Sequence, residues 1–215
     1  MLAPGTSVGQ RSRMTASRPA LIAIVAALLH LGCAGHTGAV GERNPQIALR
    51  RGGALSTYTL ALPAIWGSTA QLRLEGQTLH GFVGTGSLHL TIGDDRASGF
   101  GPSGPIDVGI RRQGGDVAVD GLWNGGPVHM VFGPTRLTGT VFRWGGNLGR
   151  QGICGYDLDR RDQAGDLVGT SICEGPPKRT RLEIHERPGA LNASELAVLL
   201  VAILANPPAT VVSPL

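Results

Sequence analysis

The chain has 215 residues, enough for one domain with a sizeable core or at most two small ones. Hydrophobic residues make up 41% of the chain and the net charge is only +4, which excludes an intrinsically disordered protein. The chain also has 34 glycines among many Val, Leu, Ile and Thr residues, which favours short strands joined by tight turns. Three of the 19 basic residues precede residue 20, and the remainder of the chain, with 16 basic and 15 acidic residues, lacks the charge excess of a nucleic-acid-binding protein.

An apolar run follows three arginines near the start of the chain. Residues 20–29, ALIAIVAALL, lie behind Arg11, Arg13 and Arg18 and ahead of small residues. This is the order of charged, apolar and cleavage regions in a secretory signal peptide. The run is too short to cross a bilayer as a helix, which takes roughly 20 apolar residues. The segment therefore predicts export, with Met14 as a second candidate start of translation.

The apolar run is followed by Leu31, Gly32 and Cys33, which resemble the lipobox of bacterial lipoproteins. In that family the chain is cleaved directly before the cysteine, which then carries the lipid. His30 departs from the family pattern, which has Leu at that position. The resemblance implies a signal peptide over residues 1–33, a lipid on Cys33 and a membrane partner reached through that lipid.

The resemblance also implies a location in the bacterial cell envelope. Ala34 follows the cysteine, and this resembles the pattern that sorts lipoproteins to the outer membrane. Residues 34–50 show little periodicity and are expected to form a flexible tether. Two alternatives stay open: cleavage after Ala39 without a lipid, which gives a periplasmic or secreted protein, or a retained anchor.

Residues 51–188 are expected to form a β domain, because a weak unit recurs in them. Each unit is an alternating strand, a polar turn and a second strand that contains a glycine; these glycines are Gly67, Gly81, Gly99, Gly121, Gly139 and Gly169. Such units match consecutive β-hairpins with one buried face. A recurring glycine inside a strand indicates bends, bulges or a close approach of two backbones.

The fold class is therefore mainly β, an antiparallel hairpin meander with one C-terminal helix. A barrel is the first expectation because a curved sheet needs such corners, with a two-sheet sandwich as the second and a β-solenoid as the third. The Asn124-Gly125 pair is suited to a type I′ hairpin turn, in which both central residues take positive φ.

Cys154 and Cys173 flank a hairpin whose turn is centred near residues 162–165. In an exported protein such a pair favours a disulfide over a metal or redox site. This pairing leaves Cys33 without a partner, which favours a lipid on it.

The C-terminal region, residues 189–215, contains a predicted helix over residues 193–205. Asn192 and Glu195 have the spacing of a capping box, and the helix is apolar on all sides. Two placements stay open: the helix is buried against the sheet or at a barrel end, or it docks on a partner or a lipid surface.

Few residues indicate chemistry. Trp66, Trp123 and Trp144 are candidates for the walls of a site for an apolar or planar ligand, although core packing or anchoring at strand ends is the favoured explanation. Two further sets are weaker candidates for metal binding. The first is His80, His89 and His129, which the polar face of a strand also explains. The second is Asp157, Asp159, Asp162 and Asp166, which a solvated turn also explains.

Gly99, Gly101 and Gly104 match a dinucleotide-binding pattern, but a strand rather than a helix follows them, which favours a turn. No catalytic residue, metal or cofactor is assigned. The expected function is that of an envelope lipoprotein with a non-catalytic structural or interaction domain and an envelope protein as partner. A carrier of a small apolar ligand inside a barrel is the alternative, and a hydrolase or metalloenzyme is the third reading.

Overall fold

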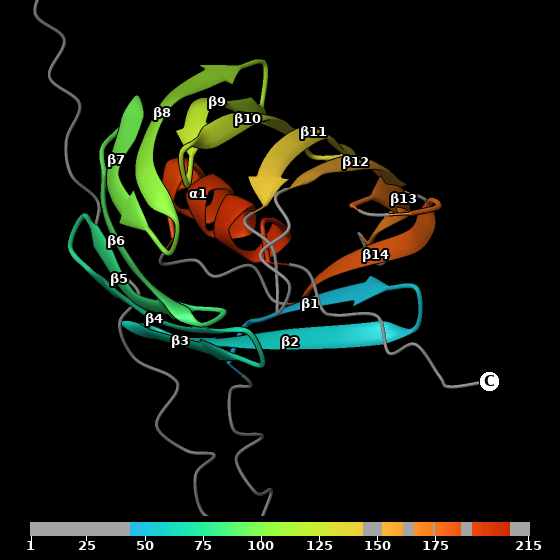
Figure 1. Cartoon of the computed structure of the whole chain (residues 1–215), viewed down its shortest axis with the longest axis horizontal. Helices are drawn as coiled ribbons and strands as arrows, with labels where there is room; N and C mark the ends of the chain where they lie inside the picture. Colours follow the sequence, from blue (N-terminus) through green and yellow to red (C-terminus); the bar gives the residue numbers. More distant parts are fainter. Residues whose placement is uncertain (1–43, 144–151, 161–165, 174, 186–190, 207–215) are drawn as a thin grey trace, which may run out of the picture. The chain divides into compact units, whose positions relative to one another are not determined.

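The computed structural model describes residues 44–143, 152–160, 166–173, 175–185 and 191–206. Within them lie fourteen strands, which form one closed antiparallel barrel in which every strand pairs with its sequence neighbours and β1 pairs with β14 (Figure 1). The strands are β1 (Gln46–Arg51), β2 (Ala54–Ala61), β3 (Ala64–Gly67), β4 (Ala70–Glu75), β5 (Thr78–Val83), β6 (Gly86–Ile92), β7 (Arg96–Gly101), β8 (Gly104–Gln113), β9 (Asp116–Trp123), β10 (Gly126–Phe132), β11 (Arg136–Arg143), β12 (Gly152–Arg160), β13 (Leu167–Ile172) and β14 (Lys178–His185). The prediction of an antiparallel meander closed into a barrel is confirmed.

Because neighbouring strands are antiparallel, all odd-numbered strands run in the same direction. They end at one rim of the barrel, which holds the β1–β2, β3–β4, β5–β6, β7–β8 and β9–β10 turns and is called the first rim below. The even-numbered strands end at the second rim. Along most strands, buried residues that face the interior alternate with residues on the outer face, whereas β1 has three consecutive buried residues, Ile47 to Leu49.

The recurring glycines let the strands approach one another closely. A Cβ atom on Gly99 would lie 2.0 Å from the backbone oxygen of His89, and one on Gly139 would lie 2.0 Å from that of His129. Gly99 and Gly139 also have φ angles of +152° and +131°, which side-chain-bearing residues rarely adopt. The prediction that these glycines mark close backbone approach is confirmed.

The single described helix, α1 (Ala193–Leu204), lies inside the barrel (Figure 1). Nearly all of its residues from Ala197 onward are fully buried, in one core with the inward-facing side chains of the strands. The predicted capping box is confirmed, because Asn192 accepts hydrogen bonds from the backbone of Ser194 and Glu195 while Glu195 accepts one from Asn192. An apolar helix is stable here because the barrel wall surrounds it on all sides.

Hydrogen bonds hold both ends of α1. At its N-terminus the Arg112 guanidinium donates to the Ser194 hydroxyl over 2.7 Å. At its C-terminus the Tyr156 hydroxyl donates to the Leu204 carbonyl over 2.7 Å. Because Arg112 lies near the end of β8, the helix begins at the second rim and ends toward the first.

The boundary between tether and domain differs from the expected one. Residues 46–50, assigned to the tether from the sequence, belong to β1, and Ile47 and Leu49 are fully buried in the core. The strand was missed because its six residues contain only two apolar residues at alternating positions that pack inside, too few for a clear pattern.

Two local predictions are also confirmed. Cys154 and Cys173 form a disulfide between β12 and the end of β13. Asn124 and Gly125 take φ angles of +55° and +79°, as a type I′ turn requires. The only helix in the described part of the chain, α1, is not long enough to cross a bilayer.

Candidate functional site: the first rim of the barrel

Large apolar side chains are exposed on the outer wall of the barrel. Phe100 is 69% exposed, Phe82 61% and Trp66 57%, and the set found in the described residues is Leu55, Trp66, Phe82, Phe100, Leu122, Ile153 and Ile172. These seven residues are called the apolar ring below. Isolated exposed apolar residues need no explanation, but a set with a common position in the fold does.

All seven residues of the apolar ring lie at the first rim. Four of them, Trp66, Phe82, Phe100 and Leu122, are the penultimate residues of odd-numbered strands. Ile172 ends β13, and Leu55 and Ile153 are the second residues of β2 and β12, which begin at the same rim. The ring therefore follows the circumference, from β2 and β3 round to β12 and β13.

Small and uncharged residues form the described turns of the first rim. Examples are Gly52-Gly53, Gly84-Thr85 and Pro102-Ser103. Among the described residues of these turns and the two adjoining residues of each strand, the charged ones are all basic: Arg50, Arg51, Arg143, Lys178 and Arg179. In its described residues the first rim is thus apolar on its outer side, and its charged residues are basic; Glu174, between β13 and β14 in the sequence, lies outside them.

The rest of the outer wall is polar and carries both signs of charge. Arg96 and Asp107 form a two-bonded pair at 2.7 Å, and this partner holds the pKa of Asp107 below its ordinary value. Arg111 lies 2.6 Å from Asp120, and Arg136 lies 3.3 Å from Asp157. The large exposed apolar side chains are therefore confined to about the last two strand positions at the first rim.

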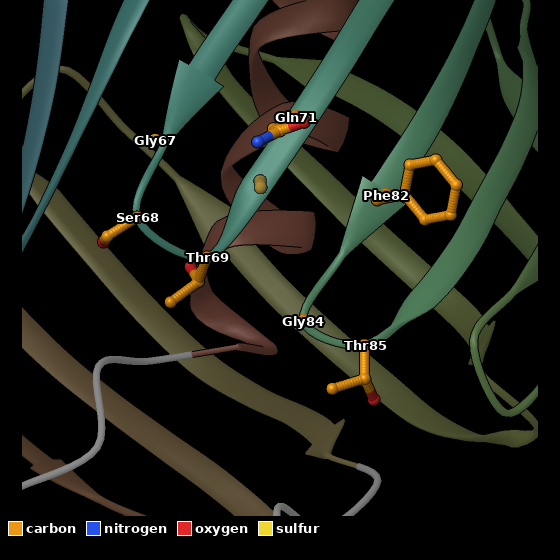
Figure 2. A pocket seen from close by; sticks show the side chains of 8 residues that line it. Gly67, Ser68, Thr69, Gln71, Phe82, Gly84 and Thr85 are labelled. Atoms are coloured by element: carbon orange, nitrogen blue, oxygen red, sulfur yellow. The ribbon is translucent and has the colours of Figure 1, made fainter.

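A small depression opens at the first rim between the β3–β4 and β5–β6 turns (Figure 2). Its volume is about 220 Å³, and its lining includes Thr69, Gln71, Phe82 and Thr85. Drug-sized ligands occupy roughly 300–1,000 Å³, so the depression suits a side chain or part of a lipid headgroup better than a whole cofactor.

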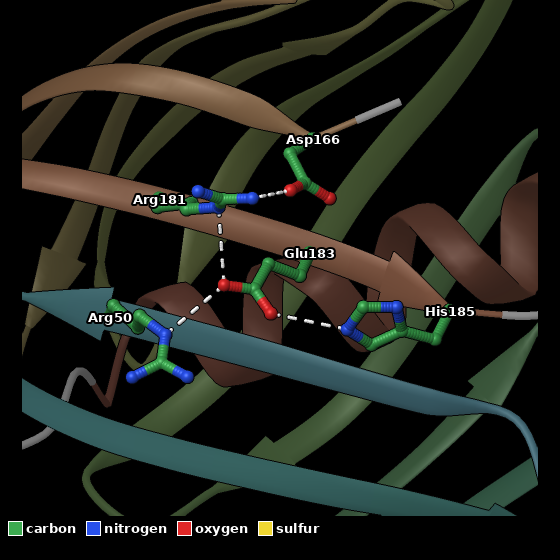
Figure 3. Close-up of polar contacts among 5 residues, drawn as sticks. All are labelled: Arg50, Asp166, Arg181, Glu183 and His185. Carbon is green, nitrogen blue, oxygen red and sulfur yellow. Dashed lines mark hydrogen bonds and ion pairs between the residues drawn. The ribbon is translucent and has the colours of Figure 1, made fainter. Parts of the chain in front are cut away.

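A cluster of charged side chains joins β1 to β14 (Figure 3). Glu183 on β14 lies 3.1 Å from Arg50 on β1, from Arg181 and from His185, and Arg181 also pairs with Asp166. Burial raises the pKa of Glu183, but hydrogen bonds from His185 and Arg50 and the nearby arginine charges outweigh it and hold this pKa below its ordinary value. Each carboxylate in the cluster has a cationic partner, so the cluster stabilises the strand pair that closes the barrel.

The structure does not gather the predicted ligand-lining tryptophans at one site. Trp66 lies on the outer face of β3, while Trp123 on β9 is 1% exposed and faces the core. Trp144 lies outside the described residues, and so does Cys33. Trp66 and Trp123 therefore do not line one ligand wall, whereas a role for Trp144 and a lipid on Cys33 stay predictions.

The structure does not gather either predicted metal-binding set at one site. Of the aspartates, Asp157 and Asp159 pair with Arg136 and Asp166 pairs with Arg181. His80 and His89 are neighbours across β5 and β6, with ring centres 6.3 Å apart, whereas His129 hydrogen-bonds to Asp120. In the described ranges no group of three metal-binding side chains comes together. Asp162 falls outside those ranges. Gly99 and Gly101 belong to β7, and Gly104 begins β8.

Sequence reasoning missed the apolar ring, although a signal was present. An apolar residue on the polar side of an alternating strand, two positions before a turn, recurs at Phe82, Phe100 and Leu122. Each occurrence alone is unremarkable. Only the closed topology shows that they surround one rim.

Comparison with known proteins gives no family for this chain: no family model, no curated protein and no solved structure matches it.

Proposed function

We propose that this protein is an envelope lipoprotein whose barrel is a non-catalytic interaction module, attached to the membrane by a lipid on Cys33. The observation that carries the proposal is the filled interior. Val198, Val201 and Leu204 of α1 are completely buried at the centre of the barrel, so the outer surface is where the molecule can meet a partner.

The first rim is the part of that surface with the composition of an interaction site. Contiguous exposed apolar groups mark binding surfaces, and aromatic residues are enriched in them. The disulfide between Cys154 and Cys173 supports an extracytoplasmic location, because disulfides persist in oxidising compartments.

A carrier of a small apolar ligand is the alternative, and the geometry favours it less. A ligand inside the barrel would have to displace α1, whose core residues pack against the wall. The depression at the first rim, at about 220 Å³, has room only for part of a molecule.

Intact-mass measurement of the protein purified from its native host tests the proposal. We expect an N-terminus at Cys33 with added acyl chains, and a mass that includes the Cys154–Cys173 disulfide. The Cys33→Ser variant should lose the acyl mass and move from the membrane to the soluble fraction. An unmodified N-terminus at another residue would contradict the lipid attachment, and a small apolar molecule retained in native mass spectra would favour the carrier.

A further inference from the structure

We propose that the first rim of the barrel sinks into an anionic lipid surface, so that the barrel stands upright on the membrane. The inference deepens the proposed function and rests on its assignment of the first rim as an interaction face. It does not depend on the lipid at Cys33.

The direction of the side chains in the apolar ring favours a fluid medium over a folded partner. Outer side chains of a sheet stand roughly perpendicular to it, so Trp66, Phe82 and Ile172 point sideways, away from the barrel axis. A second barrel stacked end to end would touch the turns and leave these side chains in water. A lipid surface into which the rim inserts contacts all seven side chains of the apolar ring.

The height of the ring matches the depth of an interfacial protein. Its members lie within two residues of the strand ends, which corresponds to about 7 Å at 3.3 Å per residue. Interfacial segments bury their apolar faces about 5–10 Å into the headgroup region, where Trp and other aromatic residues are enriched. Above the ring, ion pairs such as Arg96–Asp107 and Arg111–Asp120 face outward, so the lipid contact ends there.

The charge of the first rim favours an anionic surface. Lys178 and Arg179 begin β14 at this rim. Each basic residue near an anionic membrane contributes about 1 kcal/mol of attraction. The described residues of the rim include no carboxylate, and Glu174, between β13 and β14 in the sequence, lies outside them.

The length of the chain before the barrel is compatible with this orientation. Strand β1 begins at Gln46 near the second rim, and twelve residues separate Gln46 from Cys33. At about 3.3 Å per residue, these residues can reach at most about 40 Å. This is longer than β8, the longest strand at 10 residues, so a lipid on Cys33 can enter the same membrane that the first rim touches.

Vesicle binding by a chain of residues 34–215 tests the inference. This chain lacks Cys33 but keeps every strand, the β1–β14 pairing and α1, which together form the complete core. We expect it to co-sediment with phosphatidylcholine vesicles that contain phosphatidylglycerol. The F82S/F100S variant should bind more weakly, by about tenfold for each aromatic side chain removed.

The matched control is V131S/V168S, which removes two apolar side chains from the outer wall near the second rim. It should bind as the unmodified chain does, and circular dichroism should show that both variants fold. K178E/R179E should abolish the preference for phosphatidylglycerol over phosphatidylcholine alone. Quenching of tryptophan fluorescence by brominated lipids should be strong in the unmodified chain and largely lost in W66F.

Absence of vesicle binding, or equal loss in F82S/F100S and V131S/V168S, would overturn the inference. A dimer in analytical ultracentrifugation that F82S/F100S converts to a monomer would instead assign the ring to a second copy of the chain. The intact mass of the native protein answers separately whether Cys33 carries a lipid, so the two proposals can fail independently.

Discussion

Gly139 occupies a position on β11 that no side chain can share. It faces the neighbouring strand β10 closely enough that a Cβ atom would lie 2.0 Å from the His129 oxygen and 2.8 Å from the Met130 Cα. Its φ of +131° adds backbone strain for any other residue. The position combines a steric requirement with a conformational one.

We therefore expect Gly139→Ala to lower the free energy of unfolding by about 3 kcal/mol or more, because β10 or β11 must shift. Gly109 on β8 is the matched control, since a Cβ there would meet its nearest atom at 3.8 Å and its φ is not positive. Gly109→Ala should leave the stability within about 1 kcal/mol or raise it. Urea denaturation compares the two, and equal losses would contradict the steric explanation.

Glu183 is the residue through which pH should act on the closing strand pair. Its folded pKa is held below the ordinary value of 4.5, so the folded state favours the ionised form. The stability it contributes is present above about pH 4.5 and is lost as the pH falls through the lower folded pKa.

Glu183→Gln should therefore lower the free energy of unfolding by about 2 kcal/mol at neutral pH, with the difference from the unmodified protein shrinking below about pH 4.5. Thermal melting over a range of pH measures this. Glu75→Gln, which removes half of an exposed pair with Arg73, serves as the control and should change stability by less than about 1 kcal/mol. A difference for Glu183→Gln that stays constant with pH would contradict the assignment.

At the scale of elements, hairpins and the helix were readable from the sequence because their signals are local. Alternation predicts the strands, Asn124-Gly125 predicts a turn, and Asn192 with Glu195 predicts the helix start. The pairing of Cys154 with Cys173 follows from their positions in one hairpin. β1 was not readable as a strand, because only Ile47 and Leu49 give it an alternating apolar pattern, and its pairing with β14 joins residues 129–139 positions apart in the chain.

Helix α1 stabilises the barrel by filling its interior. Leu199 of this helix is 1% exposed and belongs to the hydrophobic core. We expect Leu199→Ala to lower the free energy of unfolding by about 2–5 kcal/mol, because the close-packed interior cannot collapse fully around the cavity. Leu196, which is only partly buried, is the control, and Leu196→Ala should cost clearly less. Urea denaturation distinguishes the two, and similar losses would show that α1 packs loosely.

At the scale of the whole molecule, the size of the barrel and the apolar ring escaped prediction for the same reason. Both depend on which strands pair and in which register. The alternation of apolar and polar residues repeats every two residues, so it does not identify which strand follows which around the barrel. Phe82 and Ile172 look like unrelated surface residues in the sequence, and they share a rim only because the odd-numbered strands all run in one direction. The recurring glycines predict a barrel, but they predict neither its number of strands nor the helix inside it.

Closure should make β1 indispensable. A chain that begins at Asn44 keeps β1 and should fold as a monomer, with its barrel closed. A chain that begins at Ala54 lacks β1, exposes the edges of β2 and β14 and loses Ile47 and Leu49 from the core, so we expect it to associate through those edges. Analytical ultracentrifugation compares the two chains, and a stable monomer starting at Ala54 would contradict the prediction.

The position of α1 inside the wall sets the order in which the molecule can assemble. The helix is the last element of the described chain, yet the wall that surrounds it is made of everything before it. A helix about 10 Å wide cannot enter a sealed, close-packed cylinder, so the contents must be loaded while the seam between β1 and β14 is still open. The β1–β14 pairing and the packing of α1 thus form together, and a chain that ends before β14 has neither the helix nor the closing strand pair.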